Sequence, residues 1–321
     1  MSDFFPVNAG VRQGCVLAPS LFSACMDWIM SRMVGRSSCG VSFGDVQITD
    51  LDFADDAVIF AETLDILKEA LEGLSEEAEV LGLRVSWIKT KIQEFGDILD
   101  AAIESLSVGG ENVEIVESFT YLGSVVHRSA TCGAEVNRRI GRAQGVMNSL
   151  NKTVWRSRHL TRRTKVRVFK SLVLPVLLYS SEAWTLTDGL RRRLDSFVTS
   201  SLRRIFGYRW QDRVSNQEVL DRAEMGRVTC LIRERQLRFY GHVVRFPTSD
   251  PAYQILTCKD PRGWTRPRGR PRASWLRQLG TYMNEWSIGP AHARTIARSK
   301  PREWSKRVGA AKCRRGTCSH T

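Results

Sequence analysis

The spacing of apolar residues changes character about 130 residues into the chain. Up to that point, β-rich runs alternate with two helical patterns, at residues 19–34 and 63–81. Thr63 is placed to cap the second helix, and Gly82 to end it. Beyond Thr131, helix follows helix. The pattern therefore predicts an α+β region followed by a mostly α-helical one.

Acidic residues interrupt the β-rich part of the pattern. The runs "GVSFGDVQITDLDF" (residues 40–53) and "AVIFAE" (residues 57–62) flank Ala54-Asp55-Asp56, which predicts a hairpin with carboxylates at its tip. Shorter β-like runs follow at residues 83–95 and 117–126.

The helical part has its own stop and start signals. The predicted helical spans are residues 132–152, 161–180, 187–206, 215–224 and 227–245, with a last helical region at about 273–310. Gly207 is placed to stop one helix, and Ser215 with Glu218 forms a capping box at the start of another. Residues 261–272, "PRGWTRPRGRPR", read as a flexible basic strap. Three regions result: 1–127, 128–260 and 261–321.

Charge separates the two parts further. The chain has 321 residues, 42% of them hydrophobic, so it can bury a core. Residues 1–130 hold 8 Lys and Arg and 21 Asp and Glu, a net charge of −13, whereas residues 131–321 hold 40 and 13, a net charge of +27. Such a basic region is expected to bind a polyanion. With neither a signal peptide nor a transmembrane pattern at hand, the cytoplasm or nucleus is the expected location.

Two adjacent aspartates at a turn are usually no more than turn chemistry. Here apolar runs on both sides are expected to bury the strands, which would place the carboxylates at the rim of a buried sheet. Clustered carboxylates repel one another unless a cation neutralises them, and oxygen ligands suit Mg²⁺. Together with a polyanion partner, this favours phosphoryl transfer at a two-metal site, as in a polymerase or nuclease.

Four ordered motifs resemble one family. "FADD" (residues 53–56) resembles the two-aspartate hairpin of reverse transcriptases, and "GVRQGCVLAPSLF" (10–22), "LGLRVSWIKTK" (81–91) and "FTYLGSVV" (119–126) resemble other blocks of that family in the same order. Downstream segments such as "RQLRFYGHVVR" resemble LINE-like, non-long-terminal-repeat retrotransposons. The resemblance implies a partial polymerase palm, formed by the acidic hairpin and helices, followed by a helical thumb and tail.

The resemblance also implies roles for individual residues. Asp55 and Asp56 would be catalytic carboxylates that bind Mg²⁺ (or Mn²⁺), with Lys89 near the triphosphate as a further catalytic group. Gln13, Gly14 and Lys91 would bind substrate. For each motif alone, an ordinary loop or a solvated strand end would be the simpler interpretation. The implied partners are an RNA template, a DNA primer and deoxynucleoside triphosphates, with no membrane.

Basic helices and the strap are expected to contact the template and primer backbones. The arginines expected in this role are Arg138, Arg139, Arg142, Arg162, Arg163, Arg191, Arg192, Arg266, Arg268, Arg270 and Arg272.

One feature of the family is not found. Its third metal-binding aspartate lies on a strand well upstream of the "GVRQGC" block, and only nine residues precede Gly10 here. We therefore expect an N-terminally truncated fragment with weak or absent polymerase activity, and a palm sheet with an unpaired edge. The alternatives are a nucleic-acid-binding protein without catalysis, or a transposon relic.

Overall fold

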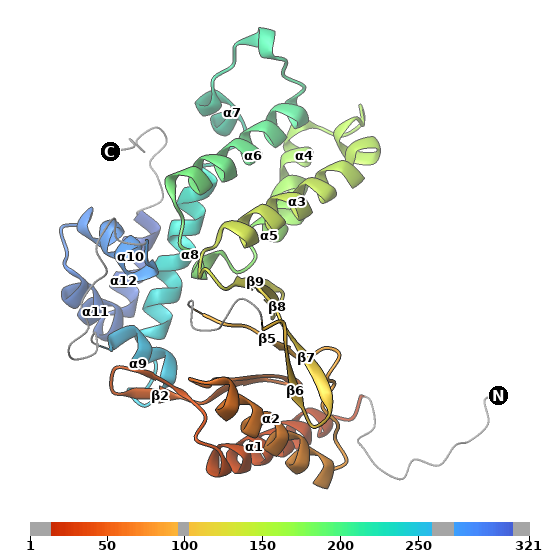
Figure 1. The fold of residues 1–321 in the computed structure, drawn as a ribbon. Coiled ribbons are helices and arrows are strands. Elements are labelled where there is room, and N and C mark those ends of the chain that lie inside the picture. Colours follow the sequence, from red (N-terminus) through yellow and green to blue (C-terminus); the bar gives the residue numbers. More distant parts are fainter. Residues whose placement is uncertain (1–13, 96–102, 259–272, 311–321) are drawn as a thin grey trace. The chain divides into compact units, whose positions relative to one another are not determined.

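The computed structural model describes residues 14–95, 103–258 and 273–310. These residues divide into two compact units, one containing residues 14–95, 103–119 and 257–258 and the other containing residues 120–256 and 273–310. Small sheets and two helices make up the first unit, and helices dominate the second (Figure 1). The predicted α+β class is confirmed. Within the described ranges, no helix is long and apolar enough to cross a membrane.

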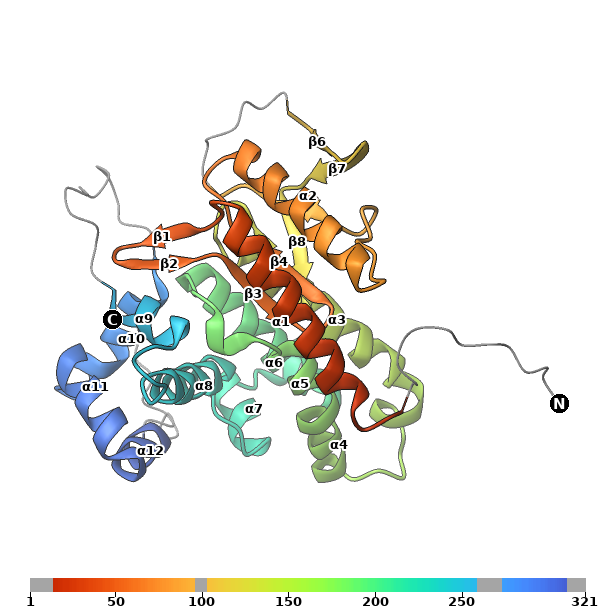
Figure 2. The same cartoon turned by 90° about the horizontal axis from the view of Figure 1, so that it is seen from below.

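The first unit contains two long helices, α1 (Ala18–Arg36) and α2 (Leu64–Val80), which lie side by side (Figures 1 and 2). The predicted cap of α2 is confirmed, because the Ile66 N–H donates to Thr63 Oγ1 over 3.4 Å. Buried Glu77 on α2 accepts a hydrogen bond from Arg32 on α1, at 2.8 Å, and forms an ion pair with Arg36. A paired charge therefore links the two helices.

The strands of this unit are β1 (Val41–Phe43), β2 (Val46–Ile48), β3 (Asp50–Phe53), β4 (Asp56–Ile59), β5 (Lys91–Ile92), β6 (Ser105–Val108) and β7 (Glu111–Ile115). They form the antiparallel pairs β1–β2 and β3–β4 and a three-stranded sheet in the order β5-β7-β6. The β-like run at residues 40–53 thus contains three strands, the hairpin β1–β2 and the first strand of the hairpin β3–β4. The run at 83–95 gives only a two-residue strand, because Lys89 and Thr90 donate their N–H groups to Ser86 O in a turn.

Two small clusters form the core of the first unit. Met30, Met33, Cys39 and Ala70 make one, and Leu71 with Ile92, Val108 and Val113 makes the other. Ala70 and Leu71, which are successive residues of α2, thus belong to different clusters. The helix predicted at residues 19–34 corresponds to α1, and its first turn is open to solvent, since Leu21 is 53% exposed.

From Ser118 onward the elements are β8 (Ser118–Tyr121), β9 (Ser124–His127), α3 (Gly133–Ser149), η1 (Asn151–Trp155), α4 (Arg162–Val168), η2 (Phe169–Val173), α5 (Leu174–Leu177), η3 (Ser181–Ala183), α6 (Asp188–Phe206), η4 (Trp210–Asp212), α7 (Asn216–Arg222), α8 (Val228–Val243), α9 (Pro251–Thr257), α10 (Trp275–Asn284), α11 (Pro290–Ser299) and α12 (Pro301–Ala310). The predicted capping box of Ser215 and Glu218 is confirmed, as is the left-handed Gly207 that ends α6. The helix expected at residues 161–180 contains a π-helical turn, η2, just before Pro175, whose missing N–H breaks the regular ladder.

Helix α8 joins two cores of the second unit. Its first half contributes Val228 and Ile232 to the core that α3 to α7 form. Its second half contributes Leu237 and Tyr240 to a core shared with α10, α11 and α12. Gln236, fully buried between them, donates to Trp184 O at 2.7 Å and accepts from Gln278 of α10 at 2.7 Å. One helix therefore holds the unit together.

Candidate active site and nucleic-acid interface

The acidic hairpin β3–β4 has a two-residue turn at Ala54 and Asp55, and Phe53 pairs with Asp56 across it. Ala54 takes a left-handed φ of +55°, as the first residue of a tight hairpin turn often does. Asp55 and Asp56 are both exposed. The predicted hairpin, with Asp55 and Asp56 at its tip, is therefore confirmed.

Strand alternation divides the acids between two faces of this hairpin. Asp50 and Asp52 share a face with Ala57 and Ile59, which pack against the cluster that includes Met30 of α1. The opposite face carries the Asp56 carboxylate and three apolar side chains, Leu51, Phe53 and Val58.

That opposite face is open to solvent. Leu51 is 44% exposed and Phe53 is 62% exposed. The expectation that the apolar runs before and after the turn bury the strands is therefore wrong for this face, and β3 and β4 pair only with one another among the described strands.

The face toward α1 carries its own electrostatic cost. Partial burial raises the pKa of Asp52, and the nearby carboxylates of Asp50 and Asp27 raise it further. Thr49 donates a hydrogen bond to Asp50 Oδ1. The acids on this face therefore repel one another.

Within the described ranges, no three His, Cys, Asp or Glu side chains converge as a metal site. The pair Asp55 and Asp56 offers exposed carboxylate oxygens, and Mg²⁺ commonly uses one or two carboxylates together with substrate phosphates. The donor set at the tip therefore fits a Mg²⁺ held jointly with a triphosphate, and does not form a complete protein cage.

The remaining site residues of the first unit are placed as follows. Gln13 lies outside the described residues. Gly14 has a φ of +83° in open space, so its backbone conformation explains the glycine without any close approach. Lys89 is exposed in the turn before β5. Lys91 Nζ donates to Glu114 Oε2 at 2.9 Å across the β5–β7 pair.

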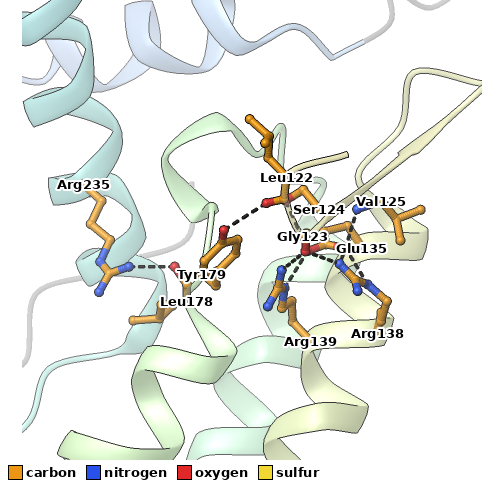
Figure 3. A network of polar contacts seen from close by, with 10 residues as sticks. All are labelled: Leu122, Gly123, Ser124, Val125, Glu135, Arg138, Arg139, Leu178, Tyr179 and Arg235. Atoms are coloured by element: carbon orange, nitrogen blue, oxygen red, sulfur yellow. Dashed lines mark hydrogen bonds and ion pairs between the residues drawn. The ribbon is translucent and has the colours of Figure 1, made fainter. Parts of the chain in front are cut away.

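A second polar site, in the second unit, surrounds the turn between β8 and β9 (Figure 3). Leu122 and Gly123 form this turn with φ of +45° and +76°, which is costly for leucine. Tyr179 donates its hydroxyl to Leu122 O at 2.9 Å, and Arg138 donates to Gly123 O at 2.5 Å. Arg139 also donates to Gly123 O. These bonds hold the strained turn against the helices.

Glu135 of α3 organises this arrangement. Its carboxylate accepts from the Val125 N–H at 2.9 Å, from Arg138 at 2.8 Å and from Arg139 at 2.6 Å. Burial opposes the charge of Glu135, yet the hydrogen bonds from Val125, Arg139 and Arg138 lower its pKa. We call Glu135, Arg138, Arg139 and Tyr179 the hairpin clamp.

Sequence reasoning missed Glu135 and Tyr179. The pattern E-x-x-R-R at residues 135–139 was the available signal, since it places two arginines three and four residues after a glutamate on one helix face.

Residues 2–126 match the family model described as reverse transcriptase (RNA-dependent DNA polymerase). These residues form a reverse transcriptase domain. The match includes both the "FADD" hairpin and the turn that the clamp holds.

Relatives place this reverse transcriptase domain among non-long-terminal-repeat retrotransposons. The chain is 27% identical over 274 residues to a transposon-derived protein of Caenorhabditis elegans, covering 80% of the chain and 94% of that protein. It is 22% identical to the RNA-directed DNA polymerase from the mobile element jockey of Drosophila melanogaster, covering 68% of the chain and 24% of that polymerase. With the Pol polyprotein from the retrotransposable element R2DM it shares 24% identity over 63% of the chain and 19% of the polyprotein.

The arginines predicted to contact nucleic acid fall into three groups by their exposure to solvent. Exposed guanidinium groups on α3, α4 and α6 belong to Arg142, Arg162, Arg163 and Arg192. Arg138, Arg139 and Arg191 are partly or fully covered, and Arg139, at 4% exposure, has little surface left for a phosphate. Arg266, Arg268, Arg270 and Arg272 lie outside the described residues.

Proposed function

We propose that the chain carries the metal-binding hairpin of a retrotransposon reverse transcriptase. Its first unit would derive from the polymerase palm, and residues 128–260 and 261–321 from the thumb and tail. The observation that carries the proposal is the exposed tip of β3–β4, where Asp55 and Asp56 adjoin the open face of Leu51 and Phe53.

Asp55 and Asp56 would hold Mg²⁺ (or Mn²⁺) together with the phosphates of a deoxynucleoside triphosphate. The metal, when bound, would polarise the reacting phosphate and lower the pKa of the attacking hydroxyl. Of the two lysines, Lys89 is the better candidate for contact with the triphosphate, because Lys91 is tied to Glu114. Gln13 and Gly14 keep their proposed place beside the substrate.

Nucleotidyl transfer by this chain alone should be slow. Two carboxylates are few ligands for the two metals that flank a transferred phosphate, and a poorly held metal activates the primer hydroxyl poorly.

Primer extension on an RNA template with Mg²⁺ tests the catalytic assignment. Asp55→Asn/Asp56→Asn is the test variant, and Asp52→Asn is the matched control, because Asp52 lies on the other face of the same hairpin. We expect slow extension by the wild type and the control, and loss of extension in the double variant. Equal extension by all three proteins would contradict the assignment.

A second candidate function is nucleic-acid binding without catalysis. The exposed arginines of α3, α4 and α6 and the net charge of +27 in residues 131–321 favour it. RNA template and DNA primer would bind chiefly through their phosphates.

Binding of the full chain to an RNA–DNA hybrid over a range of salt concentrations tests this candidate. We expect affinity to fall steeply with salt, and Asp55→Asn/Asp56→Asn to bind as tightly as the wild type in the absence of Mg²⁺. Salt-independent binding, or none, would rule the candidate out.

A further inference from the structure

The loop between α6 and α7 presents an exposed tryptophan. Trp210 is 85% exposed, more than any other tryptophan among the described residues. Figure 1 shows this loop extending beyond the ends of α6 and α7. A large aromatic side chain in water is unusual, since tryptophan is highly buried on average.

Hydrogen bonds hold the loop in a defined conformation. Arg209 donates its backbone N–H to Asp212 Oδ2 at 2.7 Å, around the single 3₁₀ turn that contains Trp210. Arg203 of α6 donates to Val214 O at 2.7 Å and to Asn216 Oδ1 at 2.9 Å, which fixes the end of the loop. The indole is therefore presented by a tied turn.

The surroundings of the indole in the sequence are basic. Arg209 precedes Trp210 directly and Arg213 follows three positions later, with Asp212 as the one acidic residue in "GYRWQDR". Arg222 of α7 lies over the Tyr208 ring, 5.3 Å from its centroid, at the foot of the loop. A protein-docking surface would join the indole to further exposed apolar side chains, whereas its neighbours in the sequence are Arg209 and Gln211.

An exposed aromatic ring between arginines is the arrangement that binds single-stranded nucleic acid, where bases stack on aromatic rings and phosphates contact cations. We propose that Trp210 stacks on an unpaired base whose flanking phosphates lie against Arg209 and Arg213. The inference rests on the proposed nucleic-acid-binding function and assigns to it a contact specific for unpaired strands.

Substitutions at Trp210 test the stacking contact in the full chain. Affinity is measured for a labelled single-stranded RNA and for the same strand in a duplex, across salt concentrations. Trp210→Leu should weaken single-strand binding by about 5- to 100-fold, the loss typical of a removed stacking ring. Trp210→Phe keeps a ring and should stay within about threefold of the wild type. Duplex binding should change little.

Two further variants separate stacking from charge. Arg213→Gln should reduce the slope of log affinity against log salt by about 1, whereas Trp210→Leu should leave that slope unchanged. Leu172→Ala, another exposed apolar side chain of the same unit at 49% exposure, is the control and should bind as the wild type.

The outcomes distinguish the two proposals. If the wild type binds in a salt-sensitive way and Trp210→Leu binds equally well, the stacking inference is overturned and nucleic-acid binding stands. Equal losses in Trp210→Phe and Trp210→Leu would also overturn it, because a ring would then make no difference. Absence of binding by the wild type would overturn both proposals.

Discussion

Four carboxylates lie within residues 50–56, and at the scale of single residues their chemistry depends on which way each one points. Asp50 and Asp52 face the helix side of the hairpin, while Asp56 faces the open side and Asp55 lies at the tip. Under the proposed function, only the last two would share a cation with a substrate. The period of two along a strand decides this division.

Asp52→Asn should stabilise the first unit at neutral pH. Because the pKa of Asp52 is raised in the folded state, its charged form opposes folding, and this cost is absent in acid and grows as pH rises through the unfolded pKa. The gain should be about 0.5 kcal/mol or less, since solvent screens a partly exposed group. Urea unfolding measures it, with Asp45→Asn in the β1–β2 turn as control. A loss of stability on Asp52→Asn would contradict the repulsion.

Glu135→Gln should weaken the hairpin clamp by about 2–3 kcal/mol, because it leaves two arginines without their buried partner. Glu303→Gln, which removes a surface partner of Arg307, is the control and should change the stability little, because solvent screens an exposed ion pair. The folded pKa of Glu135 is lowered, so its contribution is complete above the unfolded pKa and is lost as pH falls through the folded value.

Urea unfolding followed by circular dichroism checks the Glu135 prediction. The difference between wild type and Glu135→Gln should be largest near neutral pH and should shrink below about pH 4. A difference that does not change with pH would mean that the lost charge is not the cause.

At the scale of elements, close packing of α12 on α8 accounts for the glycine in "FYGHVV". A Cβ added to Gly241 would overlap Trp304 Nε1, and that same nitrogen donates to Leu237 O at 3.1 Å. The tryptophan thus lies directly on the helix backbone. No other residue type leaves room for it.

Gly241→Ala should therefore destabilise the second unit by about 1–3 kcal/mol through overpacking. Gly145→Ala, on the exposed face of α3, meets nothing within 4 Å and should stabilise by up to about 1 kcal/mol. Thermal unfolding of the two variants gives opposite shifts if this packing is correct. A neutral Gly241→Ala would show that α12 does not pack as described.

Caps, helix stops and turn residues in the sequence correctly predicted where several helices and one hairpin begin or end. The caps at Thr63 and Ser215, the stop at Gly207 and the turn at Ala54-Asp55 all correspond to residues whose own chemistry sets the backbone. The hairpin β6–β7 carries an equally strong signal, Gly109-Gly110 with positive φ, and was missed.

Other features depend on contacts distant in sequence, and no local pattern reports them. The clamp joins Leu122 to Tyr179, and the exposure of Phe53 depends on which strands pair beside it. The sequence therefore predicted that Asp55 and Asp56 lie at the hairpin tip. It did not predict the residues of the hairpin clamp or the exposure of Phe53.

At the scale of the whole molecule, the net charge differs between the two parts of the chain. It is −13 in residues 1–130, which hold the acidic hairpin, and +27 in residues 131–321, which hold the basic helices. Double substitution Arg162→Gln/Arg163→Gln on α4 should reduce the slope of log affinity against log salt by about 2 for an RNA–DNA hybrid. Arg238→Gln on α8, which pairs with Glu234 at 2.7 Å, is the control and should leave the slope unchanged. Equal slopes in both variants would remove α4 from the proposed interface.

The central claim is that Asp55 and Asp56 hold a divalent cation together with a nucleotide. Electron paramagnetic resonance of Mn²⁺ with the full chain and a deoxynucleoside triphosphate tests it without relying on catalysis. We predict bound Mn²⁺ beyond that of the nucleotide alone for the wild type and for Asp52→Asn, and its loss in Asp55→Asn/Asp56→Asn. Identical Mn²⁺ binding by all three proteins would contradict the claim.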